Sequence, residues 1–252
     1  MRPTLAARGL LALALAACQG TPPSAPGGGA RTEEPPPMST SPALVIPAAT
    51  GTPTHLIVLL HGVGASARDL EPIARALGAA LPAAELVLPD GFHAFDGGPA
   101  GRQWFSVRGV TEYNRPARVA AAGAEVAAWI DAEVARRGLP AAQVSIVGFS
   151  QGAIVGAWLA LHRQPAPAAV VMLSGRVAEA APLPPSTTRT RVLIAHGTDD
   201  RVMPLAVVEP GARLLEAAGA QVTTRVYPGL GHTIGAEELA DVRAFLVEAL
   251  AP

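Results

Sequence analysis

The sequence predicts a doubly wound α/β domain, in which a mostly parallel sheet carries helices on both faces. Short runs rich in Val, Ile and Leu alternate along the chain with longer segments that have helical periodicity. Most of the short runs are apolar throughout, which is typical of strands buried on both faces of a parallel sheet. The chain has 252 residues, half of them apolar, which is enough for one sizeable core and one main domain.

The elements of this domain can be placed along the chain. The expected strands cover residues 55–60, 85–88, 144–147, 169–173, 192–195 and 222–227. The expected helices cover residues 68–80, 117–137, 153–162, 205–218 and 236–250. Gly138 and Gly219 directly follow two of these helices, where a left-handed closing residue is favoured. Open sheets of this kind bind ligands at the carboxyl ends of their strands, so we expect the chemistry there.

The N-terminus precedes this domain and has the pattern of an export signal. Residues 1–17 carry two arginines and then an apolar run, 10–17, that is too short to span a bilayer. The tetrapeptide LAAC, which ends at Cys18, resembles the lipobox of bacterial lipoproteins, whose cysteine is lipidated and becomes the mature N-terminus. This resemblance implies a lipid on Cys18 that anchors the chain without making it span the membrane. The alternative is an ordinary cleaved signal in which Cys18 is incidental.

Residues 18–42 are expected to form a lipidated cysteine followed by a disordered tether. The segment is rich in Pro, Gly, Ser and Thr and cannot bury enough surface to offset the entropy of ordering. Gln19 rather than Asp follows Cys18, which by the same resemblance implies an exported, membrane-anchored protein, on the outer membrane or facing the periplasm if the organism has two membranes. Because Cys18 is the only cysteine, a folded domain over residues 43–252 forms no disulfide.

The segment GFSQG, residues 148–152, has the form G-x-S-x-G. It directly follows an expected strand and directly precedes an expected helix. In this setting the two glycines permit a strained turn that pushes the central hydroxyl out at the edge of the sheet. We therefore predict that Ser150 is a nucleophile. The alternative, that Ser150 only caps the helix, explains the serine but not the two flanking glycines.

A serine hydroxyl needs a base that takes its proton and an acid that orients the base. In this fold the acid follows the serine in the chain and the histidine follows the acid. His162 follows the serine too closely, and His196 precedes the only acidic pair at a strand end. His232, in a glycine-rich loop after the last strand, is therefore the predicted base. The acid is Asp199 or Asp200, and the residues alone do not choose between them.

An oxyanion hole made from main-chain NH groups is also expected. One NH belongs to Gln151, the residue after the nucleophile. The loop LHGVG, residues 60–64, follows an early strand, and its glycines let the backbone approach a substrate. We assign the second NH to Val63. For His61, in the same loop, we expect a stabilising hydrogen bond rather than a catalytic role.

These motifs together resemble the bacterial phospholipase/carboxylesterase family, which includes the acyl-protein thioesterases and belongs to the α/β-hydrolases. The segments that carry the resemblance are LHGVG (60–64), GRQWFSV (101–107), GFSQG (148–152), HGTDDRVMP (196–204) and GH (231–232). They occur in the order and rough spacing of the family, and the resemblance covers residues 43–252. It implies the α/β-hydrolase fold, and no interval between the expected strands contains an insertion with the pattern of a large lid domain.

The resemblance also implies roles for individual residues. The family motif HGxxDxxVP has its catalytic acid at the fifth position, which is Asp200, whereas Asp199 falls on a variable position. Met203 stands where the family usually has valine. Segment 101–107 is similar to the part of the family that lines the acyl side of the pocket, which implies that Trp104 and Phe105 bind substrate. The alternative is that both aromatic residues belong to the core.

The predicted activity is that of a serine carboxylesterase, which hydrolyses a small-molecule ester or thioester through an acyl-serine. Residues 175–190 are Pro-rich and irregular, and the absence of a helical lid pattern favours short-chain esters. Two alternatives remain open. One is an exported polymer esterase or peptidase on the same scaffold, and the other is a non-catalytic surface lipoprotein that binds a ligand.

Several function classes are not indicated. The histidines and carboxylates show no metal-ligand spacing, and neither a P-loop nor a dinucleotide fingerprint is present, so no metal or cofactor is expected. The net charge is -1 and no Lys/Arg cluster stands out, so nucleic acid is not an expected partner. The sequence does not indicate an oligomeric state.

Overall fold

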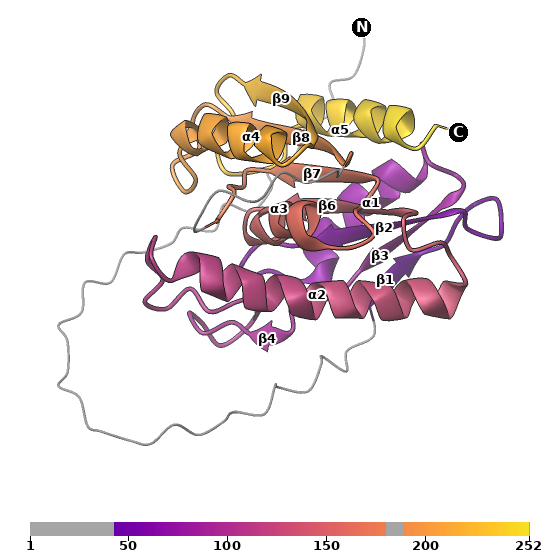
Figure 1. Ribbon diagram of the computed structural model, residues 1–252, viewed down its shortest axis with the longest axis horizontal. Helices are drawn as coiled ribbons and strands as arrows, with labels where there is room; N and C mark the ends of the chain where they lie inside the picture. The colour runs from indigo at the N-terminus through magenta and orange to yellow at the C-terminus, as the bar shows by residue number, and fades with distance from the viewer. Residues whose placement is uncertain (1–42, 180–188, 252) are drawn as a thin grey trace, which may run out of the picture. The chain divides into compact units, whose positions relative to one another are not determined.

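The computed structural model describes residues 43–179 and 189–251, which lie within one compact unit spanning Ser39–Pro252 (Figure 1). The predicted signal peptide, the lipidated cysteine and the tether lie outside the described residues. A seven-stranded sheet forms the centre of the unit. Across the sheet the strands are β1 (Leu44–Ile46), β3 (Ala84–Leu88), β2 (His55–Leu60), β6 (Val144–Phe149), β7 (Ala169–Leu173), β8 (Arg191–Gly197) and β9 (Gln221–Tyr227).

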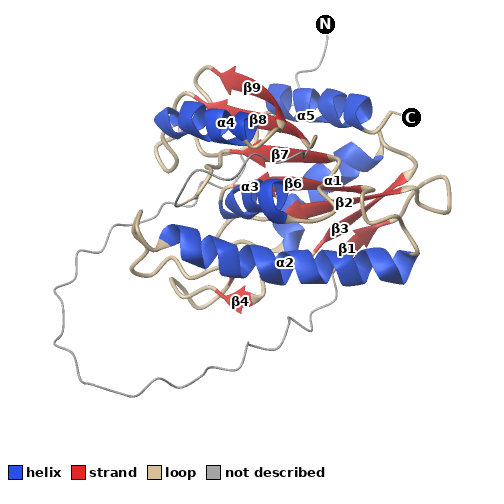
Figure 2. Ribbon diagram, viewed as in Figure 1, coloured by secondary structure: helices blue, strands red, loops and turns tan. Residues whose placement is uncertain are grey.

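All neighbouring strands of this sheet run parallel except β1, which pairs antiparallel with β3. The helices are α1 (Glu71–Gly78), α2 (Arg115–Arg137), α3 (Gln151–His162), α4 (Val208–Ala217) and α5 (Ala236–Ala249), with short 3-10 helices η1 (Ala67–Leu70) and η2 (Leu205–Val207). Helices α2, α3 and α4 cover one face of the sheet, and α1 and α5 cover the other (Figure 2). The fold is thus the mostly parallel, doubly wound sheet that the sequence predicts.

The central strands are buried on both faces, which explains their continuously apolar sequences. In β2, Leu56, Val58 and Leu60 belong to the core under α2, α3 and α4. The alternate residues Ile57 and Leu59 belong to the core under α1 and α5. Since successive side chains of a strand point to opposite faces, one run of six residues supplies both cores.

The six predicted strands and five predicted helices are all present, and β2 and β7 have the predicted bounds, whereas the ends of the other elements are shifted. The structure adds β1 and a two-stranded ribbon formed by β4 (His93–Ala94) and β5 (Arg102–Gln103), all too short to show a pattern in the sequence. The helix predicted over 68–80 divides into η1 and α1, with Pro72 in the first turn of α1. Within the described residues, no helix is long and apolar enough to cross a membrane.

The order of the strands determines where a ligand can bind. From β2 the chain crosses over to β3 on one side, and it later returns to β6 on the other side of β2. The connections that leave the carboxyl ends of β2 and β6 therefore diverge to opposite faces. Such a switch point creates a crevice at the carboxyl edge of the sheet. The segments at this crevice are the loop after Leu60 and the turn after Phe149.

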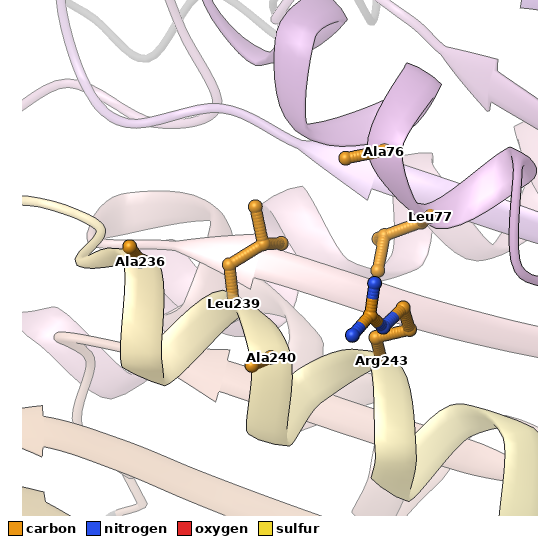
Figure 3. Close-up of a pocket in the computed structure, with 6 residues that line it drawn as sticks. All are labelled: Ala76, Leu77, Ala236, Leu239, Ala240 and Arg243. Carbon is orange, nitrogen blue, oxygen red and sulfur yellow. The ribbon is translucent and has the colours of Figure 1, made fainter. Parts of the chain in front are cut away.

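A separate cavity of about 200 Å³ lies between α1 and α5 (Figure 3). The residues that line it are Ala76, Leu77, Ala236, Leu239, Ala240 and Arg243. Five of these six residues are alanine or leucine, contributed by the two helices, and the sixth is Arg243. None of the lining residues is among the predicted catalytic residues. This cavity is therefore distinct from the crevice at the carboxyl edge.

Candidate active site

Ser150 occupies the turn between β6 and α3 in a strained backbone conformation. Its φ is 52° and its ψ is -114°, a region that residues other than glycine rarely adopt. The Ser150 NH donates to the carbonyl of Leu173 at 2.9 Å, which ties the turn to β7. The conformation holds Ser150 at the carboxyl edge, where the strand ends and the helix begins.

The two glycines of the turn are required by close packing. A Cβ at Gly148 would lie 2.4 Å from the carbonyl oxygen of Gly152, and a Cβ at Gly152 would lie 2.0 Å from that of Leu60. Both distances are far below any real contact of a Cβ atom. The first turn of α3 therefore lies against the end of β2, which no larger residue at position 152 would permit.

Ser150, His232 and Asp200 form a continuous chain of hydrogen bonds. The distance between Ser150 Oγ and His232 Nε2 is 2.9 Å, and that between His232 Nδ1 and Asp200 Oδ2 is 2.7 Å. An imidazole with its proton on Nδ1 donates to Asp200 and accepts from the serine hydroxyl, which satisfies both contacts. The three side chains come from the loops after β6, β8 and β9. They meet although 82 residues separate Ser150 and His232 in the chain.

The carboxylate of Asp200 is held by its own turn. Its Oδ1 accepts from the NH of Val202 at 2.9 Å and from the NH of Met203 at 2.8 Å. Burial tends to raise the pKa of Asp200, but the hydrogen bonds from Met203, His232 and Val202 outweigh it and lower the pKa below its ordinary value. Asp200 is therefore a carboxylate throughout the neutral range and can stabilise a protonated His232.

His196 stabilises this turn through a hydrogen bond to its main chain. It is fully buried, and its Nε2 lies 2.7 Å from the carbonyl oxygen of Met203 and 3.6 Å from Asp200 Oδ2. Nε2–H therefore donates to Met203, the residue whose NH holds the carboxylate. Sequence reasoning excluded His196 as the base but did not find this role. The HG pair of the motif HGTDDRVMP was the only signal that could have indicated it.

Gln151 directly follows the nucleophile, and Gly62, the residue before Val63, lies against it. Gln151 is the first residue of α3, where helical NH groups have no partner within the helix. Val63 follows Gly62, at which a Cβ would lie 3.3 Å from Ser150 Cβ. In the described part of the chain, neither amide donates to a carbonyl or a side chain. The assignment of these two NH groups to an oxyanion hole stays a prediction.

The loop that contains Val63 is held by its neighbours. His61 Nδ1 lies 2.7 Å from the carbonyl oxygen of Gly62, and His61 Nε2 accepts from the NH of Gly91 at 2.8 Å. These partners assign the proton to Nδ1, and burial lowers the pKa of His61, so its imidazole is neutral. His61 therefore has the structural hydrogen bonds that the sequence led us to expect.

The side chain of Gln151 has a second role that the sequence did not reveal. Its Oε1 accepts from the NH of Trp104 and its Nε2 donates to the carbonyl of Phe105, each at 2.8 Å. Trp104 in turn donates its Nε1–H to the carbonyl of His61 at 2.8 Å. The start of α3 and the loop after β2 are thus joined through one buried segment, and nothing local in the sequence could have found these contacts.

Trp104 and Phe105 are only 1% and 6% exposed and belong to the core under α2, α3 and α4. Their burial agrees with the alternative interpretation that both are core residues. That they also line an acyl pocket stays a prediction. Gly101, at the start of this segment, is required by packing, because a Cβ there would lie 2.1 Å from the carbonyl oxygen of Gly64.

Metal ligands are not gathered at this edge. Among residues 43–179 and 189–251, no group of three or more His, Cys, Asp or Glu side chains could hold a metal ion.

A strained serine turn on a doubly wound sheet, with a histidine and an aspartate delivered by later loops, defines the α/β-hydrolase class of proteins. The model of the phospholipase/carboxylesterase family matches residues 42–250, so the chain belongs to that family. Relatives of the chain are named as esterases, carboxylesterases and thioesterases, and the chain is a carboxylic ester hydrolase.

Two curated relatives and one solved structure illustrate the similarity. Esterase YpfH of Escherichia coli is 36% identical over 182 residues, which cover 71% of this chain and 76% of that protein. Carboxylesterase SOBER1 of Arabidopsis thaliana is 31% identical, covering 75% of this chain and 88% of that protein. The crystal structure of esterase PE8 is similar with a TM-score of 0.75 and 30% identity, covering 83% of this chain and 99% of the other.

Proposed function

We propose that the protein is a serine carboxylesterase that acts through an acyl-serine intermediate, with Ser150, His232 and Asp200 as its catalytic triad. The observation that carries the proposal is the chain of hydrogen bonds at 2.9 and 2.7 Å that links the three side chains. Ser150 Oγ attacks the acyl carbon while His232 Nε2 accepts its proton. The depressed pKa of Asp200 keeps a negative charge beside the imidazolium that forms.

The remaining steps use the same groups. The NH groups of Val63 and Gln151 would stabilise the oxyanion of the tetrahedral intermediate. His232 then gives its proton to the leaving alcohol or thiol, which departs and leaves the acyl group on Ser150. A water molecule that His232 deprotonates attacks the acyl-serine, and the carboxylic acid is released.

Short-chain esters are the proposed substrates. The Pro-rich, irregular sequence of residues 175–190, which follow β7 at the carboxyl edge, supports this proposal because it has no pattern of a helical lid. An exported polymer esterase or peptidase would use the same triad, so a panel of substrates must separate these activities. Hydrolysis of p-nitrophenyl acetate and butyrate well above that of long-chain esters, polyesters and peptides would support the proposal, and the reverse order would contradict it.

The Ser150→Ala variant tests the triad directly. We expect it to lose turnover of p-nitrophenyl butyrate by at least about 10³-fold and to lose all labelling by a fluorophosphonate, because the nucleophile is absent. Its circular dichroism and Tm should stay close to those of the wild type. A variant that retained turnover would refute the assignment. A wild-type protein that neither turns over esters nor reacts with the fluorophosphonate would favour the non-catalytic alternative.

We further propose that the protein is exported and anchored by a lipid on Cys18. The pattern of residues 1–18 supports this proposal, and the residues concerned lie outside the described part of the structure. Expression of the full chain in a bacterial host with metabolic fatty-acid labelling should show incorporation into the wild type and none into Cys18→Ser. Equal labelling, or an unchanged membrane fraction in the variant, would refute the anchor.

A further inference from the structure

Glu238 is a fully buried carboxyl group directly behind the loop that presents His232. It lies in the first turn of α5, six positions after His232, and its exposed fraction is 0%. Its Oε2 accepts from the NH of Gly235 at 3.0 Å. Its Oε1 is buried and has no hydrogen-bond partner. The mechanism described above assigns no role to this side chain.

Gly235 is the end of the loop that carries His232. The NH of Gly235 donates to Glu238, and the carbonyl of Gly235 accepts from the NH of Leu239 at 2.9 Å, which is the first hydrogen bond of α5. A Cβ at Gly235 would lie 3.2 Å from a methyl carbon of Leu230, so both ends of the loop are packed together. The hydrogen bond from Gly235 to Glu238 therefore fixes the loop that places His232 between Ser150 and Asp200.

The surroundings of Glu238 oppose a negative charge on it. The neighbouring titratable groups are Asp200 from the turn after β8 and Tyr227 from the end of β9. On α5 itself, Asp241 accepts a hydrogen bond from the Tyr227 hydroxyl at 3.0 Å. The nearby cation Arg225 lies 4.0 Å from Asp241 and forms its ion pair there, not with Glu238. No ion pair within the described residues involves Glu238.

An ionised Glu238 would thus be a buried carboxylate with one hydrogen bond, close to the negative Asp200. Such a charge is strongly disfavoured, and the neutral acid is favoured instead. Burial and, secondarily, the charge of Asp200 raise the pKa of Glu238 to about 7, although the hydrogen bond from Gly235 opposes the shift.

We propose that Glu238 is a positioning residue that, as a neutral carboxylic acid, anchors the His232 loop through Gly235, and that its ionisation releases this anchor and lowers esterase activity. The inference rests on the proposed role of His232 as the catalytic base. The Gly235 hydrogen bond by itself favours the carboxylate, but burial and Asp200 outweigh it. Ionisation therefore favours an opened loop in which the carboxylate reaches water, and the Gly235 contact and the placement of the imidazole are lost together. Glu238 would in this way make turnover sensitive to alkaline pH.

The first test compares Glu238→Gln with Glu238→Ala in the full chain. Gln keeps an oxygen that can accept from Gly235 and has no charge, so at pH 6 we expect a kcat within about 2-fold of the wild type. Ala removes the anchor, and we expect kcat to fall by at least about 10-fold with KM within about 2-fold. Glu237→Gln and Glu237→Ala are matched controls, because Glu237 is the exposed neighbour in the same helical turn.

The second test uses pH. From pH 6 to pH 9, the ratio of kcat for Glu238→Gln to kcat for the wild type should rise several-fold, because only the wild type can ionise at this position. The ratio for Glu237→Gln should stay flat. An independent readout is Tm, which does not require turnover.

The sign of the Tm effect follows from proton linkage. The pKa of Glu238 in the folded protein is raised above its ordinary 4.5, so the folded state binds the extra proton between about pH 4.5 and 7. Wild-type stability therefore falls as pH rises through this window. The Tm of Glu238→Gln relative to the wild type should rise from pH 4.5 to 7 and stay constant above it.

Three outcomes would overturn the proposal. Glu238→Gln could lose as much kcat as Glu238→Ala, Glu238→Ala could keep its kcat and pH profile, or the Tm difference could be independent of pH. If Glu238→Ala does not fold, the pH series of Glu238→Gln still decides. If Ser150→Ala retains activity, the proposed function fails, whereas the Tm series still reports separately on whether Glu238 is buried as a neutral acid.

Discussion

Asp199 and Asp200 are adjacent and chemically identical, and only their surroundings in the fold distinguish them. The Asp200 side chain accepts from His232 and from two main-chain NH groups. Asp199 is exposed, and its Oδ1 accepts from the hydroxyl of Thr198 at 2.9 Å. In the sequence the two residues could be separated only by resemblance to a family motif. In the structure they are distinguished by their contacts, because the turn after β8 directs Asp200 toward His232 and leaves Asp199 exposed.

This difference predicts unequal effects of two matched substitutions. Asp200→Asn should lower kcat for p-nitrophenyl butyrate by roughly 10³- to 10⁴-fold, because an amide can hold the imidazole in the wrong tautomer and cannot stabilise its charge. Asp199→Asn should stay within about 2-fold of the wild type, since its carboxylate contacts neither His232 nor Ser150. Steady-state kinetics at neutral pH measure both. A collapse of Asp199→Asn with an active Asp200→Asn would move the acid by one position.

At the scale of elements, α3 contains two glycines with opposite requirements. A Cβ at Gly152 would lie 2.0 Å from the carbonyl oxygen of Leu60 and 2.8 Å from that of His61. A Cβ at Gly156, one turn further along the same helix, would meet only methyl groups of Ile146 and Val170, both at 3.5 Å. The first glycine permits α3 to approach β2 and the loop after it, whereas the second has ordinary van der Waals space.

Alanine substitutions should therefore act in opposite directions. Gly152→Ala must push the start of α3 away from β2, and we expect a loss of about 2–3 kcal/mol in unfolding free energy together with loss of fluorophosphonate labelling. Gly156→Ala should be neutral or stabilising by up to about 1 kcal/mol, because alanine favours the helix and its Cβ fits. Urea denaturation of both variants gives the comparison. Equal destabilisation would show that packing at Leu60 does not determine the effect.

The elements that the sequence predicted are those whose own residues carry the signal. The β6 strand is a run of apolar residues, α2 has helical periodicity, and the turn around Ser150 has two glycines at fixed spacing. By contrast, β1, β4 and β5 have two or three residues each and exist only because a partner strand is present. The contacts of Gln151 with Trp104 and Phe105 depend in the same way on a segment distant in the chain, so no local pattern could reveal them. The bond between Gly235 and Glu238, by contrast, spans three residues as a capping box at the start of α5, and a local pattern could have indicated it.

At the scale of the whole molecule, His55 and Glu238 make stability respond to pH in opposite directions. His55, at the start of β2, has its Nε2 3.0 Å from Ser145 Oγ, and burial lowers its pKa from 6.5 to about 4. Between pH 4 and 6.5 the unfolded chain binds a proton at His55 that the folded protein does not. Stability from His55 is therefore complete above pH 6.5 and decreases as pH falls toward 4. Glu238 acts in the opposite sense over an overlapping range.

Replacement of His55 should separate its contribution to the pH dependence of stability from that of Glu238. His55→Gln cannot titrate but can still form a hydrogen bond to Ser145, so its Tm should fall less than that of the wild type between pH 6.5 and 4. Any difference in Tm between the two proteins at pH 7.5 reflects the altered contact to Ser145 alone, and it serves as the reference for the differences at lower pH. Thermal unfolding across this range tests the prediction, and parallel curves for the two proteins would contradict it.

The antiparallel direction of β1 decides how the molecule can be immobilised. Leu44 pairs with Leu88, the last residue of β3, so the chain enters the domain at the edge of the sheet that holds Ser150. The ion pair of Arg191 with Glu248 places the end of α5 beside the start of β8, at the opposite edge. A bead, dye or support coupled at residue 43 would therefore be attached on the side of the proposed catalytic triad. Coupling through the C-terminal helix would leave that side clear.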